Sequence, residues 1–219
     1  MITASGPYSA QELAVAEAVK TFTMTSGQFV IYTQRLIQDL NARQIPGAVV
    51  ECGVWRGGQI MAAAMADNGH RHYWLYDTFE GMQSVSEHDV RNGKHATESL
   101  KWRKGGHEGL NWCRADLDDV QTNVWSVVDP SRTHFVKGDV CETLQQSDLP
   151  DEIALLRLDT DFYLSTKIEL EVLYPRLVSG GYLVVDDYHS WDGARKAVDE
   201  YFGIDQEFTR NKFVTLIKP

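Results

Sequence analysis

Short apolar runs alternate with helical patterns from Gly47 onward, and this alternation limits the possible folds more than any other feature of the chain. The runs show little polar alternation, as expected for parallel strands that are covered on both faces. We expect strands at 48–52, 72–76, 134–137, 153–158 and 182–185. Helical patterns separate most of them, at about 58–67, 118–127, 165–177 and 193–202. This rhythm predicts an α/β fold, in which helices cover both faces of an open, mostly parallel sheet.

Two helical patterns precede the sheet and predict a helical extension over residues 1–46. The first follows Ser9, which forms a capping-box pattern with Glu12. The second has apolar residues at i, i+3 and i+4 spacing and ends before Pro46. A chain of 219 residues is long enough for one well-filled core, so we expect residues 1–219 to form a single domain.

Two segments break the rhythm. Residues 84–115 are polar, contain glycines and carry six basic residues, namely Arg91, Lys94, Lys101, Arg103, Lys104 and Arg114. An insertion of this length is usually a functional lid or a disordered loop, and we favour a lid because Trp102 and Trp112 need a surface to pack on. Further along the chain, Phe208 and residues 213–217 predict a final hairpin with one antiparallel strand.

The net charge of -10 argues against a general nucleic-acid binder, because neutralising phosphates requires surplus Lys and Arg. It also fits poorly with docking on anionic lipid. The three cysteines, Cys52, Cys113 and Cys141, form no CxxC pair, so we expect neither a disulfide framework nor a zinc site. The N-terminus has no basic region followed by an apolar run, and no stretch approaches the roughly 20 apolar residues that span a bilayer. We therefore expect a cytoplasmic protein with no membrane or nucleic-acid partner.

An acid and a glycine-rich turn come together at the end of the first predicted strand. Glu51 lies in that strand, and the turn CGVWRGG follows it up to Gly58. Ligands of open α/β sheets bind outside the carboxyl ends of the strands, where the strand order reverses, and glycines let the backbone approach a ligand closely. Asp77 ends the next strand about twenty residues beyond the turn, where an acid can accept both hydroxyls of a ribose. A plain tight turn and a helix-capping aspartate are the structural alternatives, but the two acids together favour a nucleoside site.

The strongest chemical signal is a pair of carboxylates after each of two consecutive strands. Asp159 and Asp161 follow the strand at 153–158, and Asp186 and Asp187 follow the next one. Successive strands are often neighbours, so we expect these four acids, called the acid rim below, at one edge of the sheet. Partly buried anions raise one another's pKa unless a cation neutralises them. Carboxylates without His or Cys companions favour Mg²⁺, Mn²⁺ or Ca²⁺ over zinc, whereas helix caps and surface turns explain one aspartate better than four.

Four further side chains have a supporting or an open role. Phe79 either flanks a nucleoside ring or lies in the core. Asp139, at the end of a later strand, either lies beside an adenine or caps the helix that begins at Val140. Arg56 and Arg157 are candidates to balance the negative charge of the acid rim, which would be a structural role.

At these motifs the chain resembles the macrocin O-methyltransferase family, whose members methylate sugar hydroxyls of antibiotics. The similar segments are ECGVWRGG (51–58), LYDTFEGM (75–82), FVKGD (135–139), ALLRLDTDFYLST (154–166) and YPRLVSGGYLVVDDYHSWDGARKAVDEYF (174–202), with a short match at FTMTS (22–26). The pairing of LRLDTDFYLST with GGYLVVDDY is the most specific part. The resemblance implies a class I methyltransferase fold with a Rossmann-like sheet of seven strands. It also implies the cofactors S-adenosylmethionine and Mg²⁺ or Mn²⁺.

The resemblance further implies a role for each site residue. Asp159, Asp186 and Asp187 would bind the metal ion, and Asp161 would act as the general base. Glu51 and the glycine turn would hold the amino-acid part of the cofactor, and Asp77 would hold its ribose. With Phe79 from the reasoning above, the expected cofactor-binding residues are Thr25, Ser26, Glu51, Gly53, Val54, Gly57, Asp77, Phe79 and Asp139.

The predicted function is S-adenosylmethionine- and metal-dependent O-methylation of a hydroxyl, on a sugar of a natural product or glycoside. A metal-dependent glycosyltransferase is the alternative, with residues 159–161 as a DxD site for a nucleotide sugar, but it leaves Asp186 and Asp187 without a clear role. The missing GxGxxG motif disfavours a nicotinamide oxidoreductase, and a non-enzymatic binding module on the same sheet is a further alternative. The family resemblance and the helical N-terminus suggest a homodimer.

Overall fold

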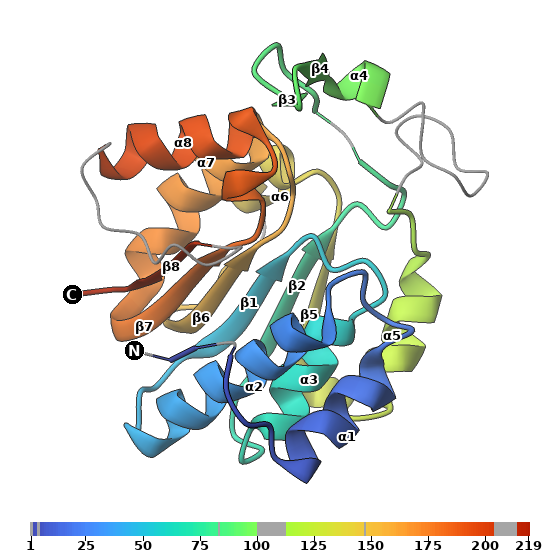
Figure 1. The fold of residues 1–219 in the computed structure, drawn as a ribbon, viewed down its shortest axis with the longest axis vertical. Helices are drawn as coiled ribbons and strands as arrows, with labels where there is room; N and C mark the ends of the chain where they lie inside the picture. Colours follow the sequence, from blue (N-terminus) through green and yellow to red (C-terminus); the bar gives the residue numbers. More distant parts are fainter. Residues whose placement is uncertain (1, 4, 83, 100–112, 147, 204–213) are drawn as a thin grey trace.

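The computed structural model describes residues 2–3, 5–82, 84–99, 113–146, 148–203 and 214–219 (Figure 1). Within these residues, six strands form the main sheet, in the order β5-β2-β1-β6-β7-β8. Their bounds are β1 Ala48–Cys52, β2 Tyr73–Asp77, β5 Thr133–Lys137, β6 Ile153–Leu158, β7 Leu177–Val185 and β8 Val214–Ile217. All neighbouring strands run parallel except β8, which pairs antiparallel with β7. The predicted α/β fold with a mostly parallel sheet is therefore confirmed.

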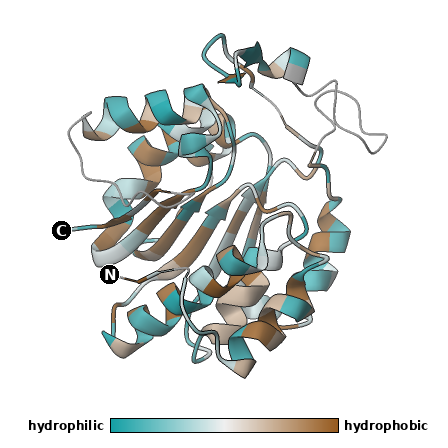
Figure 2. Ribbon diagram, in the orientation of Figure 1, coloured by the Kyte–Doolittle hydropathy of each residue, from teal (hydrophilic) through white to brown (hydrophobic). Residues whose placement is uncertain are grey.

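The sheet lies between two groups of helices (Figure 1). One face carries α1 Ala10–Val19, α2 Gly27–Ala42, α3 Gly58–Ala66 and α5 Leu117–Trp125, and the other carries α6 Val140–Gln146, α7 Tyr163–Leu173 and α8 Asp192–Phe202. Successive residues of a strand face opposite sides, so Val49 packs in the first core and Val50 in the second, and Leu155 and Leu156 divide in the same way. Because both faces are covered, the strands are hydrophobic along most of their length (Figure 2).

The observed elements follow the predicted ones closely, with one shift late in the chain. β1 and β6 have the expected bounds, but the helix expected to continue to residue 177 ends as α7 at Leu173. A short 3₁₀ turn, Tyr174–Arg176, follows it. Pro175 lies in this turn, where its missing N–H and its ring oppose a continuing α-helix. β7 consequently begins at Leu177, earlier than the apolar run alone indicated.

The expectation of seven strands is wrong for the described part of the chain, where the main sheet has six. The five apolar runs that the sequence marked as strands correspond to β1, β2, β5, β6 and β7, and β8 is the sixth strand. β8 forms the antiparallel arm of the predicted terminal hairpin. Phe208, expected in the other arm, lies outside the described residues.

The order of the strands reverses between β1 and β6. The chain proceeds outward from β1 to β2 and β5, returns to β6 beside β1, and then continues outward to β7 and β8. Such a reversal opens a crevice at the carboxyl ends of the two central strands. Gly53 follows β1 and Asp159 follows β6, so the glycine turn and the first acid pair meet at this point.

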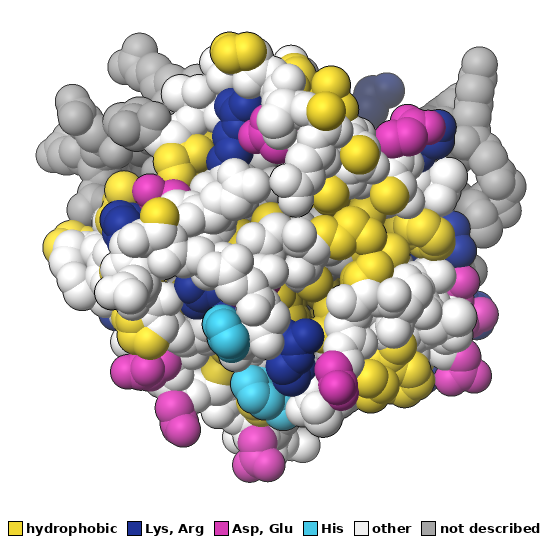
Figure 3. Space-filling model, turned by 90° about the horizontal axis from the view of Figure 1, so that it is seen from below, with side chains coloured by type: hydrophobic (Ala, Val, Ile, Leu, Met, Phe, Trp, Pro, Cys, Tyr) yellow, Lys and Arg dark blue, Asp and Glu magenta, His cyan; other side chains and the backbone are white. Residues whose placement is uncertain are grey.

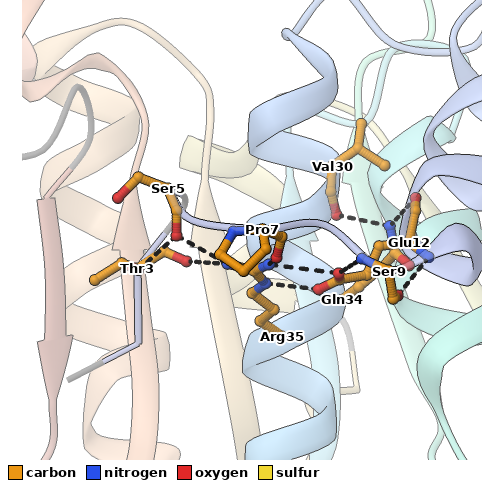
Figure 4. A network of polar contacts seen from close by, with 8 residues as sticks. All are labelled: Thr3, Ser5, Pro7, Ser9, Glu12, Val30, Gln34 and Arg35. Atoms are coloured by element: carbon orange, nitrogen blue, oxygen red, sulfur yellow. Dashed lines mark hydrogen bonds and ion pairs between the residues drawn. The ribbon is translucent and has the colours of Figure 1, made fainter.

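Residues before α1 are held along α2 by Arg35 (Figure 4). The Arg35 guanidinium donates to the backbone carbonyl oxygens of Thr3, Ser5 and Pro7. It also donates to Oε1 of Glu12 at 2.6 Å, and this hydrogen bond lowers the pKa of Glu12 to about 2. Ser9 and Glu12 form the predicted capping box at the start of α1. The two predicted helices of the extension are thus present and tied together through polar contacts.

The predicted insertion is described over residues 84–99 and 113–115. It contains a two-stranded hairpin, β3 Val90–Arg91 and β4 Lys94–His95, followed by the short helix α4 Ala96–Ser99. These elements lie beyond the carboxyl ends of the strands of the main sheet (Figure 1). Lys101, Trp102, Arg103, Lys104 and Trp112 lie outside the described residues. The interpretation of the insertion as a lid stays a prediction.

A second hollow lies at the amino ends of the strands, and Gly47, Arg71, His72 and His134 are part of its lining. The face seen from below in Figure 3 shows hydrophobic side chains gathered together, with histidine and basic side chains beside them. Ligands of open α/β sheets bind at the opposite, carboxyl end, which is where the sequence motifs lie. No helix within the described ranges is long and apolar enough to cross a membrane.

Candidate active site

A cavity of about 740 Å³, its open mouth included, lies at the carboxyl ends of β1, β2, β5 and β6. Residues at the ends of these strands or just after them form much of its wall, and they include Gly53, Trp55, Asp77, Thr78, Gly138, Asp139, Asp159, Thr160 and Asp161. Met24 from the N-terminal extension and Met82 near the insertion also line it. A concave site with apolar walls and a few convergent polar groups is typical of small-molecule binding.

The turn between β1 and α3 is fastened to β2 by Asp77. Its Oδ2 accepts hydrogen bonds from the backbone N–H groups of Val54 at 2.7 Å and Trp55 at 3.0 Å. Its Oδ1 accepts from the N–H of Phe79 at 2.8 Å. Burial raises the pKa of Asp77, although these three hydrogen bonds favour the ionised form. Asp77 therefore holds the glycine turn in place and at the same time lines the cavity.

Gly53 allows the ends of β1 and β6 to touch. Its φ is +82°, and a Cβ at this position would overlap the backbone carbonyl oxygen of Asp159. The N–H of Asp159 donates to the carbonyl of Cys52 at 2.9 Å, which continues the pairing of the two strands beyond their ends. Only glycine meets both requirements, the left-handed φ and the missing side chain.

The structure brings the four aspartates of the acid rim together. One carboxylate oxygen each from Asp159, Asp161 and Asp187 lies within 4.8 Å of the other two. Asp161 is buried and has a φ of +67°, a conformation that non-glycine residues rarely adopt and that clusters at functional sites. Asp186 faces Arg157, with its Oδ2 at 3.5 Å from the guanidinium. The acids thus meet as the strand order implies, while their separate roles stay predictions.

Arg157 lies at the centre of these carboxylates and is only 4% exposed. Its Nη1 donates to Oε1 of Glu51 and to Oδ2 of Asp159, both at 2.7 Å. Together with the contact to Asp186, it links acids from the ends of three neighbouring strands. Arg157 therefore balances the acid rim, as expected. For Arg56 the same expectation is wrong: its guanidinium pairs with Asp119 at 2.8 Å, because the turn into α3 faces α5.

Negative charge exceeds positive charge among the described residues of this cluster. Burial, and then the neighbouring carboxylates, raise the pKa of Asp186 and of Asp187 well above the ordinary range. Burial raises the pKa of Glu51 to about 8, against the opposing charge of Arg157. Burial disfavours the charge of Arg157, but Asp159, Asp186 and Glu51 more than offset this and raise its pKa. Among the described residues, Oδ1 of Asp186 and Oδ2 of Asp187 have no hydrogen-bond partner. A cation would stabilise such a site.

Another buried acid, Glu169, lies behind the loop that carries Asp159 and Asp161. Glu169 is on α7 and is fully buried, and burial raises its pKa to about 8. The hydroxyl of Thr160 donates to its Oε1 at 2.9 Å. Thr160, between the two aspartates, is therefore hydrogen-bonded to Glu169, a side chain that lies outside the described wall of the cavity.

The segment with the expected cofactor-binding residues Thr25 and Ser26 is anchored on α3. The hydroxyl of Thr25 accepts a hydrogen bond from Nε2 of Gln59 at 2.6 Å, and Ser26 caps the start of α2 by position, without a side-chain hydrogen bond. Of these three neighbours, Met24 is the one that lines the cavity. The short sequence match therefore lies in a segment that reaches the cavity, while the cofactor-binding role of Thr25 and Ser26 stays a prediction.

The other expected cofactor-binding residues lie in the β1–α3 turn, in the hydrophobic core or against Arg157. Val54 and Gly57 lie in the β1–α3 turn, and Gly57 has a φ of +88° directly before α3. Phe79 is buried and packs against Phe135, with ring centroids 6.4 Å apart, which favours the core alternative. Glu51 faces Arg157 and is 2% exposed.

Asp139 caps the start of α6 and also lines the cavity, so its place beside an adenine stays a prediction. It lines the cavity, and its Oδ1 accepts from the backbone N–H of Cys141 at 2.9 Å, as a helix cap does. The hydroxyl of Ser84 donates to its Oδ2, which ties the start of the insertion to the end of β5.

Sequence reasoning missed Met24, Met82 and Glu169. The two methionines carry no chemical signature that separates a cavity wall from a core. Glu169 does carry a signal, because the buried face of α7 includes Ser165, Glu169 and Leu173 at a spacing of four residues. A charged residue at a position where the helical period predicts burial is unusual and indicates a specific partner.

We predict that Gly53→Ala lowers the free energy of unfolding more than Gly69→Ala does. Both glycines have a φ of +82°, so both substitutions carry the same backbone cost of about 1–2 kcal/mol. A Cβ at Gly69 meets no atom within 4 Å, whereas a Cβ at Gly53 overlaps Asp159. Overpacking should therefore add about 1–3 kcal/mol for Gly53→Ala, measured by urea denaturation. Equal losses for the two variants would contradict the close approach of β1 and β6.

We also predict that Glu169 makes stability depend on pH. Its pKa of about 8 in the folded protein lies above the ordinary 4.5, so the folded state holds a proton that the unfolded state releases. The contribution of Glu169 to the free energy of unfolding is complete below pH 4.5 and is lost as the pH rises to about 8. It amounts to about 1.4 kcal/mol per unit of pKa difference. Glu169→Gln should flatten the fall in the free energy of unfolding over this range, although Glu51 leaves a remaining slope. The exposed Glu171→Gln, two residues along the same helix, should leave the slope unchanged.

Comparisons with known proteins agree with these features. A family model described as macrocin-O-methyltransferase (TylF) matches residues 9–210. The 8-demethyl-8-(2,3-dimethoxy-alpha-L-rhamnosyl)-tetracenomycin-C 4'-O-methyltransferase of Streptomyces olivaceus is 35% identical over 78% of this chain and 63% of its own length. The demethyldecarbamoylnovobiocin O-methyltransferase of Streptomyces niveus is 32% identical over 77% of this chain and 63% of its own length. The chain thus spans 63% of the length of both relatives.

The fold comparison gives the same result. The solved structure of the O-methyltransferase NovP superposes with a TM-score of 0.74 at 28% identity, over 90% of this chain and 82% of that one. The predicted class I methyltransferase fold is therefore confirmed, apart from the number of strands. Because the family model covers most of the chain and a relative is 35% identical over more than three quarters of it, the chain belongs to the macrocin O-methyltransferase family.

Proposed function

We propose that the chain is an S-adenosylmethionine-dependent O-methyltransferase that uses a divalent metal ion and methylates a sugar hydroxyl of a natural product. The observation that carries this proposal is the acid rim with buried Arg157, beside a cavity at the reversal of strand order. The acceptor class is supported by relatives whose names specify a rhamnosyl tetracenomycin and demethyldecarbamoylnovobiocin as substrates of O-methylation.

The residues around the cavity fit a nucleoside cofactor. Gly53 exposes the backbone of the turn at the cavity wall, as close approach to a ligand requires. Asp77 lines the cavity and accepts three backbone N–H groups, and its fourth contact, from the Thr78 hydroxyl at 3.5 Å, is long enough for a ribose hydroxyl to replace it. In this proposal the turn holds the amino-acid part of the cofactor and Asp139 borders its adenine. The other members of the proposed cofactor site are Thr25, Ser26, Glu51, Val54, Gly57 and Phe79.

The acid rim fits a hard divalent cation such as Mg²⁺ or Mn²⁺. Carboxylate oxygens are the ligands these ions prefer. The unpartnered Oδ1 of Asp186 and Oδ2 of Asp187 have lone pairs to offer, and Asp159 lies beside them. We therefore keep Asp159, Asp186 and Asp187 as the proposed ligands. A cation bound there would supply positive charge that makes a nearby hydroxyl more acidic.

Asp161 is the proposed general base. Its carboxylate lies within 4.8 Å of the oxygens of Asp159 and Asp187 and lines the cavity, so it is in reach of a hydroxyl beside the acid rim. Asp161 would accept the proton of the acceptor hydroxyl, and the cofactor would supply the methyl group, whose bond to sulfur would break as the bond to the hydroxyl oxygen forms. The cavity walls orient the two substrates, which supplies much of the remaining acceleration.

The glycosyltransferase alternative has less support. It uses Asp159 and Asp161 as a DxD site but gives no role to Asp186 and Asp187, which lie in the same cluster. It also leaves the turn held by Asp77 without a function.

Calorimetric titration separates the two functions. S-adenosylhomocysteine should bind to the purified protein, whereas UDP with Mg²⁺ should not. With S-adenosylmethionine, Mg²⁺ and a panel of deoxysugar glycosides, mass spectrometry should detect the gain of one methyl group. EDTA should abolish this turnover and added Mg²⁺ should restore it. Binding of UDP without binding of S-adenosylhomocysteine would overturn the proposal, and turnover that resists EDTA would remove its metal requirement.

Asp161→Asn should separate binding from chemistry. The amide keeps the size of the side chain but cannot accept the proton, so turnover should fall by about 10²–10⁴, the usual contribution of a general base. Affinity for Mn²⁺ and for S-adenosylhomocysteine should stay close to that of the wild type. Asp151→Asn, an exposed aspartate before β6, is the matched control and should leave both unchanged. Turnover that survives in Asp161→Asn would exclude Asp161 as the base.

A further inference from the structure

The first arm of the insertion, residues 84–99, packs on the two loops that carry the acid rim. A small apolar cluster joins them, and its buried members are Ala96, Phe162, Trp191 and Ala194. Phe162 directly follows Asp161, and Trp191 follows the 3₁₀ turn that begins at Asp187. The Arg91 guanidinium lies 5.5 Å from the centroid of the Trp191 ring. The arm is therefore in contact with the segments that directly follow both acid pairs.

Asp89 is the polar centre of this contact. Its side chain is fully buried, and a carboxylate persists in such a place only when it is well hydrogen-bonded. Its Oδ1 accepts from the backbone N–H of Tyr163 at 2.7 Å. Its Oδ2 accepts from the N–H and the hydroxyl of Ser86 at 2.6 and 2.8 Å.

These hydrogen bonds place Asp89 at the amino ends of two helices. Tyr163 is the first residue of α7, and the residue in the N-cap position, Phe162, provides no side-chain cap. Asp89 therefore caps α7 from a distant part of the chain. α8 begins beside it, where a Cβ on Gly193 would overlap Oδ1 of Asp89. The dipoles of both helices favour a negative charge at this point.

The chain on each side of Asp161 is hydrogen-bonded to a buried carboxylate. On its amino side, the Thr160 hydroxyl donates to buried Glu169. On its carboxyl side, the Tyr163 N–H donates to buried Asp89. The left-handed φ of Asp161 is unfavourable for a residue with a side chain and persists only where the surroundings impose it.

We propose that Asp89 is a positioning residue that couples the insertion to the acid rim, by holding the loop from Asp159 to Tyr163 in its strained conformation. Asp89 acts through Tyr163 and lies outside the described wall of the cavity. While the arm is docked, the oxygens of Asp159 and Asp161 stay close to that of Asp187. The consequence for cation binding rests on the proposed metal-dependent function, whereas the coupling itself does not.

Hydrogen exchange of the loop tests the coupling. The N–H of Asp159 donates to the carbonyl of Cys52, and that of Phe162 to the carbonyl of Thr160, so both amides report the loop conformation without touching Asp89. Asp89→Ala should make both exchange about tenfold faster, as expected when a local structure loses a hydrogen bond to a charged group. Glu87→Ala is the matched control, because it removes an exposed charge two residues away in the same arm, and it should leave exchange unchanged.

Metal affinity provides the functional readout. Asp89→Ala should raise the Kd for Mn²⁺ about 10- to 100-fold, the effect of removing groups that orient metal ligands, and should leave the Kd for S-adenosylhomocysteine unchanged. A general loss of structure would weaken both ligands together. Asp89→Asn keeps one oxygen for the Tyr163 N–H and should fall between Asp89→Ala and the wild type.

The outcomes distinguish failure of this inference from failure of the proposed function. Unchanged exchange of the Asp159 and Phe162 amides in Asp89→Ala would overturn the coupling. If Asp89→Ala does not fold, Ser86→Ala is the second variant, because it removes only the hydroxyl that donates to Asp89. The Asp159 and Phe162 amides must still exchange faster in Ser86→Ala than in the wild type, or the coupling is again overturned. A wild-type protein that binds S-adenosylhomocysteine but no Mn²⁺ would refute the metal proposal, while faster exchange in Asp89→Ala would still support the coupling.

Discussion

The buried guanidinium of Arg157 is the contact on which the carboxyl edge of the sheet depends. Glu51 belongs to β1, Asp159 follows β6 and Asp186 follows β7, so one cation ties the ends of three neighbouring strands. Breaking a buried ion pair by removing one partner typically costs about 3–5 kcal/mol, because the other charge stays buried without compensation. Here three carboxylates share the same partner, so the arrangement of the whole edge follows from the position of one side chain.

The contacts around Arg157 act on the backbone rather than on the cavity directly. Gly53 lets β1 approach β6 so closely that the two strand ends touch, and Asp77 fastens the intervening turn to β2. On the other side, Glu169 and Asp89 hold the residues on either side of Asp161. Buried polar groups thus fix the loops, and the fixed loops present the acid rim to the cavity. The loops at this edge are therefore held by buried side chains that lie below the surface that a ligand would touch.

The sequence was sufficient for the parts of this edge that follow strand periodicity. Apolar runs located the parallel strands, and an acid pair after each of two consecutive strands predicted that Asp159 and Asp187 would meet. It was not sufficient where a contact joins segments with no common pattern. Asp89 belongs to an insertion without periodicity, and its partner is a backbone N–H seventy-four positions away, which no local rule reveals. The expectation for Arg56 failed for a related reason, since the direction of a side chain in a turn depends on backbone angles that composition does not encode.

The negative charge that Arg157 leaves unbalanced points to a role for this edge other than stability. Replacing buried ionic groups by apolar ones is often neutral or stabilising, so stability alone does not account for four carboxylates at one edge of the sheet. Asp186 and Asp187 have raised pKa values because they are buried next to other carboxylates, and a divalent cation would relieve the same repulsion. Mg²⁺ tolerates little departure from its preferred geometry, which gives a physical reason for holding the loop that carries Asp159 by buried partners on both sides. In the proposed enzyme, the strain at Asp161 and the negative charge of the acid rim are two parts of one requirement: a metal ligand and a general base on the same loop that are already in place before the cation binds.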